Sequence, residues 1–424
     1  MNWHVFVVDT YSYPVHTTKG FCGVKNPKGG GRKGLLYDIK TYRKGDYVIF
    51  YQMRVDESSP LSRGFRDVFR IVSDPFYDDT SVTSDTNTVL GKCPICGYSY
   101  SEKPDNDGIY HCTNPNVNPH TIPTGQHILP YRVLIEPVMR FDDPVDDNTA
   151  YIDVEDNGEL PTLRWRKITG AGRSRSAQRI LPEEAEKLVR LMKKINANYQ
   201  NDSLKTLNYT TPQMIANKLV PETLNIVRDT SGVPLYTVKR NGSLADESGL
   251  EAWMLENIDK NIPVLAEIIG DLDELEFWGN NVQDGVGGEN ADILTLHKRN
   301  GKRFKATVFE LKKDEVNKDT INQVLNPEKQ NYAKWIGQLV TANCNPPIEK
   351  LQIQPIMVGF KVDQSAIEQI QNIQNNFSTF TNEMIIDYKY RNRTSVKIKV
   401  LKPILLSYKV VGSTVELRRE SYTL

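Results

Sequence analysis

The sequence has no long apolar run and little cysteine, and both absences narrow the class of protein. No stretch approaches the roughly eighteen apolar residues of a membrane-spanning helix. The start, MNWHVFVVDTYSYP, lacks the charged segment before an apolar segment that a signal peptide has. Five cysteines in 424 residues are too few for the disulfide framework of a secreted protein. We therefore expect a soluble, cytoplasmic protein that does not insert into a membrane.

An excess of charge of one sign is also missing. Lysine plus arginine and aspartate plus glutamate both number 53, so the formal net charge is zero. Proteins that bind nucleic acid through their overall charge are usually basic, so this balance argues against strong non-specific binding but permits a local basic surface. The length of 424 residues exceeds one ordinary domain and predicts at least two separate cores.

The most informative stretch is ADILTLHKRNGKRFKATVFELKKD, residues 291–314. It places Asp292 at the head of one apolar strand and Glu310, Leu311 and Lys312 at the end of the next. Side chains alternate between the faces of a strand, so Glu310 and Lys312 share one face while Leu311 points into the core. Two carboxylates and an ammonium group that converge suit metal-assisted hydrolysis of a phosphodiester. Alternating charges also occur on exposed strand edges, so the motif needs support from its neighbours.

The spacing D-(x)17-E-x-K resembles the PD-(D/E)XK nuclease superfamily. Upstream, the strings LEAWMLEN and IPVLAEIIG are similar to the C-terminal catalytic domain of NucS-type DNA endonucleases. The resemblance implies an acidic residue on the preceding helix, which Glu251 fits, and a glutamine on the following helix, which Gln323 fits. That family places a tyrosine about one helical turn after its glutamine, whereas this chain has Pro327, so Gln330 is an alternative to Gln323.

This resemblance also implies roles for the residues of the motif. Asp292 and Glu310 are expected to hold Mg²⁺ or Mn²⁺, and Lys312 to position or activate water. Glu251 is expected to bind the metal directly or through water. The fold implied for residues 246–424 is a restriction-endonuclease-like mixed sheet flanked by helices.

Three of the five cysteines lie close together in the sequence and predict a zinc site. Cys93 and Cys96 form the knuckle C-P-x-C-G, which turns both thiolates towards one point, and Cys112 and His120 would complete a tetrahedral set. His111 is the alternative fourth ligand, although it is adjacent to Cys112 and would point the other way in an extended segment. Four protein ligands leave no open position for a substrate, so we expect a structural zinc ion. Surface thiols without metal are the alternative.

The chain divides into two halves with a polar segment between them. Residues 1–195 contain short strands rich in aromatic and β-branched residues and end in an amphipathic helix over 182–195, which predicts a small mixed barrel with peripheral helices. Residues 196–245 are predicted to be a linker, with one helix around 212–219. From 246 to 424 the predicted order is helix, strand, strand, helix, strand, helix and two further strands. The fold class is therefore multidomain, α+β or α/β.

Four segments of the first half are similar, in order, to the EVE domain: KGDYVIFY, SDPFYD, LPTLRW and GAGRS. The EVE domain is a PUA-like β-barrel related to the YTH and ASCH readers of nucleic acid. The resemblance covers residues 1–195 and is interrupted by the zinc knuckle at 91–122, which the basic EVE pattern lacks. It implies a pocket that receives an extruded base, where stacking and hydrogen bonds to the base edge decide its identity.

Aromatic and basic residues of the first half are the candidates for contact with nucleic acid. The aromatic candidates, each of which has a place in the core as its alternative, are Trp3, Tyr51, Phe76, Tyr77 and Trp165. The basic candidates for contact with phosphate are Arg164, Arg166, Lys167, Arg173 and Arg175. The loop KNPKGGGRK, residues 25–33, is a further phosphate candidate, with a solvated turn as its alternative.

Joined together, the two halves have the layout of a modification-dependent restriction endonuclease. We expect a reader of a modified base, cytosine above all, fused to a magnesium-dependent nuclease that cuts double-stranded DNA. A NucS-like endonuclease that repairs mismatches or deaminated bases is the alternative, although NucS-type proteins carry a different N-terminal domain. A non-catalytic reader of modified RNA is the second alternative, and the intact Asp292, Glu310 and Lys312 argue against it. One nuclease site cuts one strand, so cleavage of both strands predicts a homodimer.

Overall fold

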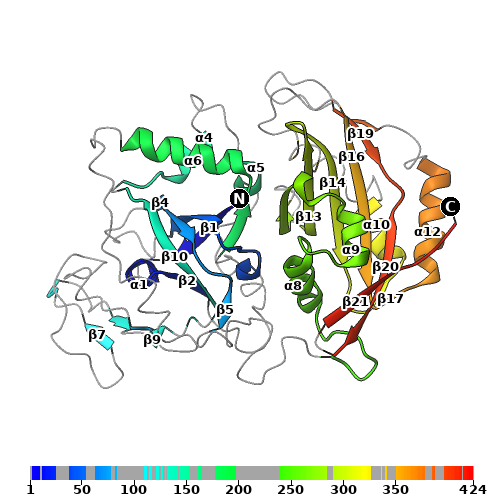
Figure 1. The fold of residues 1–424 in the computed structure, drawn as a ribbon, viewed down its shortest axis with the longest axis horizontal. Helices are drawn as coiled ribbons and strands as arrows, with labels where there is room; N and C mark the ends of the chain where they lie inside the picture. Colours follow the sequence, from blue (N-terminus) through cyan, green and yellow to red (C-terminus); the bar gives the residue numbers. More distant parts are fainter. Residues whose placement is uncertain are drawn as a thin grey trace. The chain divides into compact units, whose positions relative to one another are not determined.

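The chain folds into two compact units of mixed α+β structure, seen in a computed structural model (Figure 1). The first unit comprises Met1–Gly158 and Lys167–Val233, and the second comprises Glu159–Arg166 and Pro234–Leu424. The residues that the structure describes are 2–9, 12–24, 38–53, 63–77, 82–83, 109–111, 114–116, 121–123, 126–127, 129, 131–141, 143–152, 160–164, 177–196, 238–283, 290–325, 336, 340, 350–377, 384–386, 396–412 and 414–423.

The first unit is built on a curved seven-stranded sheet with the order β11-β1-β3-β4-β10-β2, in which β5 also pairs with β10 (Figure 1). The strands are β1 (Trp3–Val8), β2 (Phe21–Val24), β3 (Tyr47–Gln52), β4 (Gly64–Ile71), β5 (Phe76–Tyr77), β10 (Tyr131–Met139) and β11 (Ala177–Ile180). The pair β1 and β3 is parallel, and the other pairs are antiparallel. Among the described residues the strand path runs from β11 to β2 as a curved, half-barrel sheet, and we predicted a small mixed barrel here.

Short helices and two small two-stranded sheets complete the described part of the first half of the chain. The helices are α1 (Ser12–Lys19), α4 (Asp147–Ile152), α5 (Pro161–Arg164) and α6 (Pro182–Ile195). The small sheets pair β6 (Val82–Thr83) with β9 (Gln126–His127), and β7 (Ile109–His111) with β8 (Thr121–Pro123). Helix α6 begins with a proline, and the Glu184 side chain accepts a hydrogen bond from the backbone N–H of Leu181 at 2.8 Å. The bounds of α6 confirm the helix predicted over residues 182–195.

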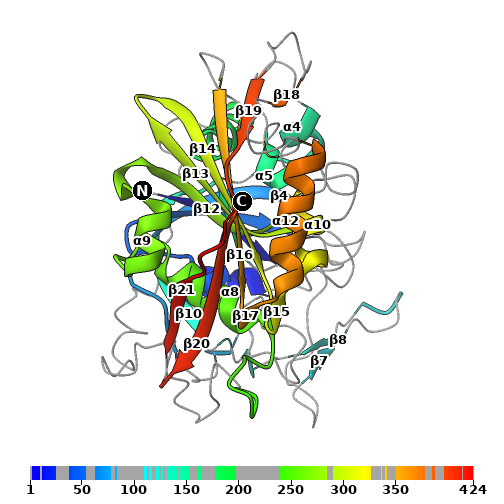
Figure 2. The same cartoon turned by 90° about the vertical axis from the view of Figure 1, so that its right-hand side faces the viewer.

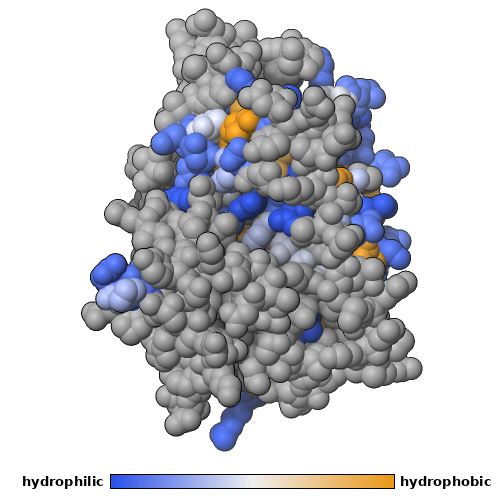
Figure 3. Space-filling model, turned by 90° about the vertical axis from the view of Figure 1, so that its left-hand side faces the viewer, coloured by the Kyte–Doolittle hydropathy of each residue, from blue (hydrophilic) through white to orange (hydrophobic). Residues whose placement is uncertain are grey.

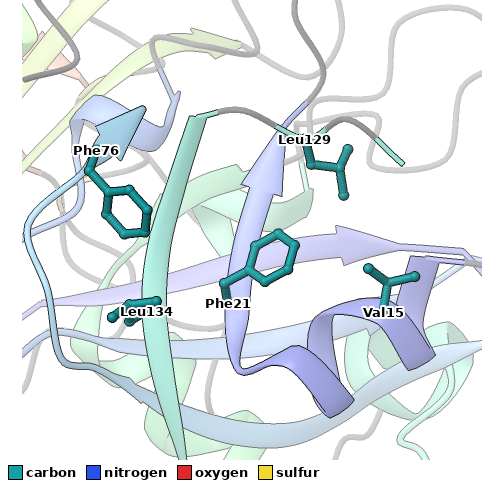
Figure 4. Close-up of a cluster of buried hydrophobic side chains, with 5 residues drawn as sticks. All are labelled: Val15, Phe21, Phe76, Leu129 and Leu134. Carbon is teal, nitrogen blue, oxygen red and sulfur yellow. The ribbon is translucent and has the colours of Figure 1, made fainter. Parts of the chain in front are cut away.

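A cluster of apolar side chains joins α1 to the strands of the first unit (Figure 4). Val15 comes from α1, Phe21 from β2, Phe76 from β5 and Leu134 from β10. The guanidinium of Arg132, itself 1% exposed, lies 4.6 Å from the centre of the Phe21 ring. Burial of these side chains removes apolar surface from water, which stabilises the packing of the helix on the sheet.

The second unit is an eight-stranded mixed sheet with the order β12-β13-β14-β16-β19-β18, extended by β20 beside β16 and by β21 beside β20. Its strands are β12 (Leu275–Gln283), β13 (Asn290–Arg299), β14 (Lys302–Leu311), β16 (Lys350–Gly359), β18 (Met384–Ile386), β19 (Val396–Val400), β20 (Ile404–Val411) and β21 (Thr414–Arg419). Strands β12, β13 and β14 are antiparallel neighbours, whereas β16 is parallel to β14, β19 and β20. The short strands β15 (Glu315–Val316) and β17 (Lys361–Val362) form a separate parallel pair.

Helices cover this sheet. Helices α10 (Lys318–Leu325) and α12 (Gln364–Phe377) lie side by side, and α10 contacts β16 (Figure 2). Helix α8 (Glu247–Asn257) packs on β12, β13 and β14, and α9 (Pro263–Ile269) packs on β21. The short 3-10 helix Leu272–Glu274 leads into β12. The arrangement agrees with the predicted mixed sheet flanked by helices, but β12, β20, β21 and α9 were not predicted as separate elements.

The β13–β14 hairpin sets the register that matters for function. Its turn contains Asn300 and Gly301, both with positive φ, of 51° and 76°. Two such residues suit the turns whose twist matches that of a hairpin. The register pairs Ile293 with Phe309, so the next residues outward are an aspartate on β13 and a glutamate on β14.

Candidate active site

Asp292, Glu310 and Lys312 lie together at the open end of the β13–β14 hairpin. Asp292 Oδ2 accepts a hydrogen bond from the backbone N–H of Leu311 at 2.7 Å. Lys312 Nζ donates to Glu310 Oε1 at 2.6 Å, so these two side chains share one face. Leu311, between them in sequence, is 1% exposed and belongs to the core. The alternation of faces that the sequence predicts is confirmed for these residues.

Negative charge is concentrated in a buried place. Glu310 is buried, and its Oε2 atom has no hydrogen-bond partner among the residues that the structure describes. Burial raises the pKa of Glu310, although the nearby Lys312 ammonium acts in the opposite direction. Burial, and then the charge of Glu310, raise the pKa of Asp292 well above its usual range. Each carboxyl group therefore opposes ionisation of the other, and an added cation would relieve both.

Helix α8 brings two more acidic residues to this place. Glu251 is buried, accepts a hydrogen bond from Asn280 Nδ2 of β12, and also helps to raise the pKa of Asp292. Glu247, one helical turn earlier, has its Oε2 atom 3.9 Å from Lys312 Nζ. We predicted Glu251 but missed Glu247 and Asn280. The spacing of four residues on one helix face was a signal for Glu247, whereas Asn280 gave no signal because its strand was not predicted.

Helix α10 places Gln323 beside Glu310. The amide of Gln323 contributes to lowering the pKa of Glu310, against the larger effect of burial. Even so, the geometry does not amount to a hydrogen bond at Glu310 Oε2. The alternative glutamine, Gln330, lies outside the described residues.

The donor set suits a hard divalent cation. Within the described ranges, no group of three or more histidine, cysteine, aspartate or glutamate side chains is arranged to enclose a metal ion. Mg²⁺, however, is usually held by one or two carboxylates, with water and substrate phosphate completing its coordination. Asp292 and Glu310 supply two carboxylates, and Glu310 Oε2 is a buried oxygen that none of the described residues contacts through a hydrogen bond. These residues therefore fit Mg²⁺ or Mn²⁺.

Two aromatic residues predicted for a base pocket lie in the core of the first unit instead. Tyr51 is 0% exposed, and its hydroxyl donates to Asp147 Oδ1 at 2.8 Å. Phe76 is also 0% exposed and belongs to the apolar cluster of Figure 4. Trp3 is half-buried and stacks on Tyr47, with ring centres 4.8 Å apart. Stacking on a base needs an open ring face, so the core alternative holds for Tyr51 and Phe76.

The other predicted nucleic-acid and zinc residues cannot be placed in this way. Outside the described residues lie Trp165, Arg166, Lys167, Arg173, Arg175, Cys93, Cys96, Cys112, His120 and residues 25–33. Arg164 is the last residue of α5, Tyr77 ends β5, and His111 ends β7. The ladder of the β7–β8 pair reaches His111 and Thr121, which are the sequence neighbours of Cys112 and His120.

The first unit contains a buried polar cluster that we did not predict from the sequence. Tyr13 donates its hydroxyl hydrogen to Asp67 Oδ2 and accepts from Arg140 Nη2 at 2.6 Å. Arg66 Nη1 donates to Gln52 Oε1 at 3.1 Å, while the buried Gln52 Nε2 has no acceptor among the described residues. Asp67 has a φ of 42°, a strained value for a residue other than glycine.

On the face drawn in Figure 3, the described residues are mostly hydrophilic, with small apolar areas.

No protein-family model and no curated protein sequence matches the chain. Among solved structures, a hypothetical protein from Leishmania major is 11% identical, covering 46% of this chain and 96% of its own, with a TM-score of 0.26. Human THYN1 in complex with DNA containing 5-methylcytosine is 10% identical, covering 46% of this chain and 98% of its own, with a TM-score of 0.24. A protein from Pseudomonas syringae is 13% identical, covering 45% and 99%, with a TM-score of 0.24. Likeness at this level assigns no activity to the chain.

Proposed function

We propose that the second unit is a metal-dependent endonuclease that hydrolyses phosphodiester bonds in double-stranded DNA. One observation carries the proposal: Asp292, Glu310 and Lys312 converge, and one buried oxygen of Glu310 has no hydrogen-bond partner in the described part of the chain. Buried charge of one sign is costly unless it is compensated, and such sites are typically functional. A structural ion pair needs only one carboxylate for one lysine. Two carboxylates with a lysine beside them are better explained by the binding of a divalent cation and a phosphate.

Each residue of the site has a distinct role in this proposal. Asp292 and Glu310 would hold Mg²⁺ or Mn²⁺, and such an ion supplies an activated water molecule and stabilises the charge on the leaving oxygen. Lys312 carries an ammonium group, one-quarter exposed, that can meet a phosphate oxygen or orient the attacking water. Asn280 holds Glu251 close to Asp292, and Gln323 lies against Glu310.

The first unit, we propose, reads a modified base that is extruded from the duplex. The similarity of four segments to the EVE domain supports this function, and cytosine is the expected base. A second copy of the chain would supply the site for the other strand.

A digestion of three duplexes tests the combined function. One DNA sequence is prepared unmodified, with modified cytosine and with a mismatch, and each form is incubated with the full chain and Mg²⁺. Preferential cutting of the modified duplex supports the proposal. Cutting of the mismatched duplex alone would replace it with a repair endonuclease. Binding without cutting, in Mg²⁺ and in Mn²⁺, would leave only a non-catalytic reader.

A further inference from the structure

We infer that Glu247 is a positioning residue that receives the ammonium group of Lys312 when a metal ion occupies Glu310. The inference rests on the nuclease function proposed above. It concerns a contact between α8 and the strand end that the motif itself does not contain.

Lys312 lies near two carboxylates that differ in their distance from its ammonium group and in their exposure to solvent. Its Nζ atom is 2.6 Å from Glu310 Oε1 and 3.9 Å from Glu247 Oε2. The Glu310 side chain is 2% exposed and that of Glu247 is 45% exposed. The contact with the buried Glu310 is therefore the stronger of the two, and the contact with Glu247 is longer and more exposed to solvent.

A metal ion at Glu310 and the ammonium group of Lys312 would lie beside the same carboxylate. Lys312 Nζ donates to Oε1, which leaves Oε2 for the ion, and Asp292 accepts the N–H of Leu311 through Oδ2. A divalent ion beside Glu310 would repel the positive charge of Lys312 across a short distance in a poorly solvated place. Lys312 must then move away from Glu310 Oε1 or weaken the binding of the ion.

The position of Glu247 suits it to receive the displaced ammonium group. It is the first residue of α8, and the helix start is fixed because Asp246 accepts a hydrogen bond from the backbone N–H of Gly249 at 3.1 Å. The helix is anchored by buried side chains, including Leu250 and Met254. A fixed backbone with a half-exposed side chain lets the carboxylate follow Lys312 by rotamer changes alone. The ammonium group is thus kept near the site and not released to solvent.

A double-mutant cycle on metal binding tests this without DNA. Binding of Mn²⁺ to the full chain is measured by calorimetry for the wild type, Glu247→Gln, Lys312→Met and the double variant. Glu256→Gln is the control, because Glu256 lies on the same helix and pairs with Lys260 at 3.7 Å, not with Lys312. We expect Glu247→Gln to weaken Mn²⁺ binding about 5- to 10-fold, a coupling typical of charged groups in contact. Lys312→Met should not weaken it, and the double variant should match Lys312→Met.

Three results would overturn the inference. One is a Glu247→Gln protein that binds Mn²⁺ as the Glu256→Gln control does. Another is a Glu247→Gln substitution that weakens binding equally in the Lys312→Met background, because Glu247 would then act on the metal or on folding. The third is a cleavage rate of Glu247→Gln that stays low at saturating Mn²⁺, since a weaker affinity alone must be overcome by more metal.

The same measurements separate this inference from the function on which it rests. If the wild type binds no Mn²⁺ beyond what Asp292→Asn binds, the nuclease proposal fails and the inference falls with it. If the wild type binds Mn²⁺, Asp292→Asn does not, and Glu247→Gln behaves as the control, only the role of Glu247 is refuted.

Discussion

A single carboxylate oxygen determines much of the chemistry open to the second unit. Glu310 Oε2 is buried and has no hydrogen-bond partner within the described ranges, while Oε1 accepts a hydrogen bond from Lys312. A buried ionised oxygen in this state costs free energy unless a cation compensates it. The raised pKa values of Glu310 and Asp292, caused first by burial, express the same cost. Residues selected only for stability would not be expected to keep such a pair.

We predict that alanine at Asp292, Glu310 or Lys312 abolishes cleavage and leaves DNA binding nearly unchanged. Each substitution removes a metal ligand or the charge beside the phosphate, and the loss of one preorganised group commonly costs about 3 kcal/mol of transition-state stabilisation. Lys361→Ala is the control, because Lys361 pairs with Glu315 on the surface at 2.9 Å. Cleavage rates and DNA affinities are measured side by side, and full activity of Lys312→Ala would refute the assignment.

His297 is expected to make the second unit sensitive to acid. Burial, and then the charge of Lys305, lower the pKa of His297 from 6.5 to about 4. Because the pKa is lower in the folded state, the unfolded chain takes up the proton more readily. Stability is therefore retained above about pH 6.5 and lost as the pH falls towards 4, by on the order of 2–3 kcal/mol.

The measurement for this prediction is hydrogen exchange of the β13 amides between pH 7 and pH 4, corrected for the intrinsic effect of pH. Protection should decrease more in the wild type than in His297→Gln, which keeps a partner for Thr295 Oγ1, 3.0 Å from the ring nitrogen, but does not titrate. Equal loss of protection in both proteins would show that His297 is not the acid-sensitive group.

At the scale of elements, local patterns predicted some structures well and others not at all. Helices α6 and α12 were predicted because apolar residues recur at helical spacing over several turns. Strand β12 was missed because Gly279 and two asparagines interrupt its pattern. Helix α9 has only seven residues, too few for a clear period. Tertiary packing against β21 and β13 supplies what these segments lack in local signal.

The zinc knuckle at 91–122 remains a prediction at this scale. We expect about one tightly held zinc ion per chain, because Cys93, Cys96, Cys112 and His120 provide four ligands. Its removal should destabilise the first unit and spare the second, since metal binding contributes folding free energy where it occurs. Elemental analysis of protein purified without chelator is the measurement. The His120→Ala protein should lose the metal, and the His111→Ala protein should keep it. Wild-type protein that contains no zinc would refute the prediction of a zinc site.

For the whole molecule, we propose a division of function between the two units, with recognition in the first and cutting in the second. Their described residues form separate sheets, and no described helix is long and apolar enough to cross a membrane. The formal net charge of zero means that affinity for DNA must come from local groups and not from an overall attraction.

We predict that full-length Lys312→Met protein binds modified duplex more tightly than unmodified duplex. Trp165→Ala should remove that difference, which we expect to be about 1–3 kcal/mol, the usual contribution of one stacked base. Arg173→Ala should weaken binding to both duplexes alike and flatten its salt dependence, because phosphate contacts carry no information on modification. The measurement is a titration of each protein with both duplexes at several salt concentrations. Equal affinity of the Lys312→Met protein for both duplexes would contradict the reader function and favour a repair endonuclease.

The sequence by itself determined the local part of the candidate active site. Asp292, Glu310 and Lys312 belong to one hairpin, where the alternation of faces and a two-residue turn suffice to bring them together. Only the tertiary structure decided which other groups join them. Glu247 comes from a helix that packs on the sheet, and Asn280 from a strand that pairs beside β13. Contacts of that kind, and the burial that shifts the pKa values, arise from packing between distant segments, which no local pattern of residues encodes.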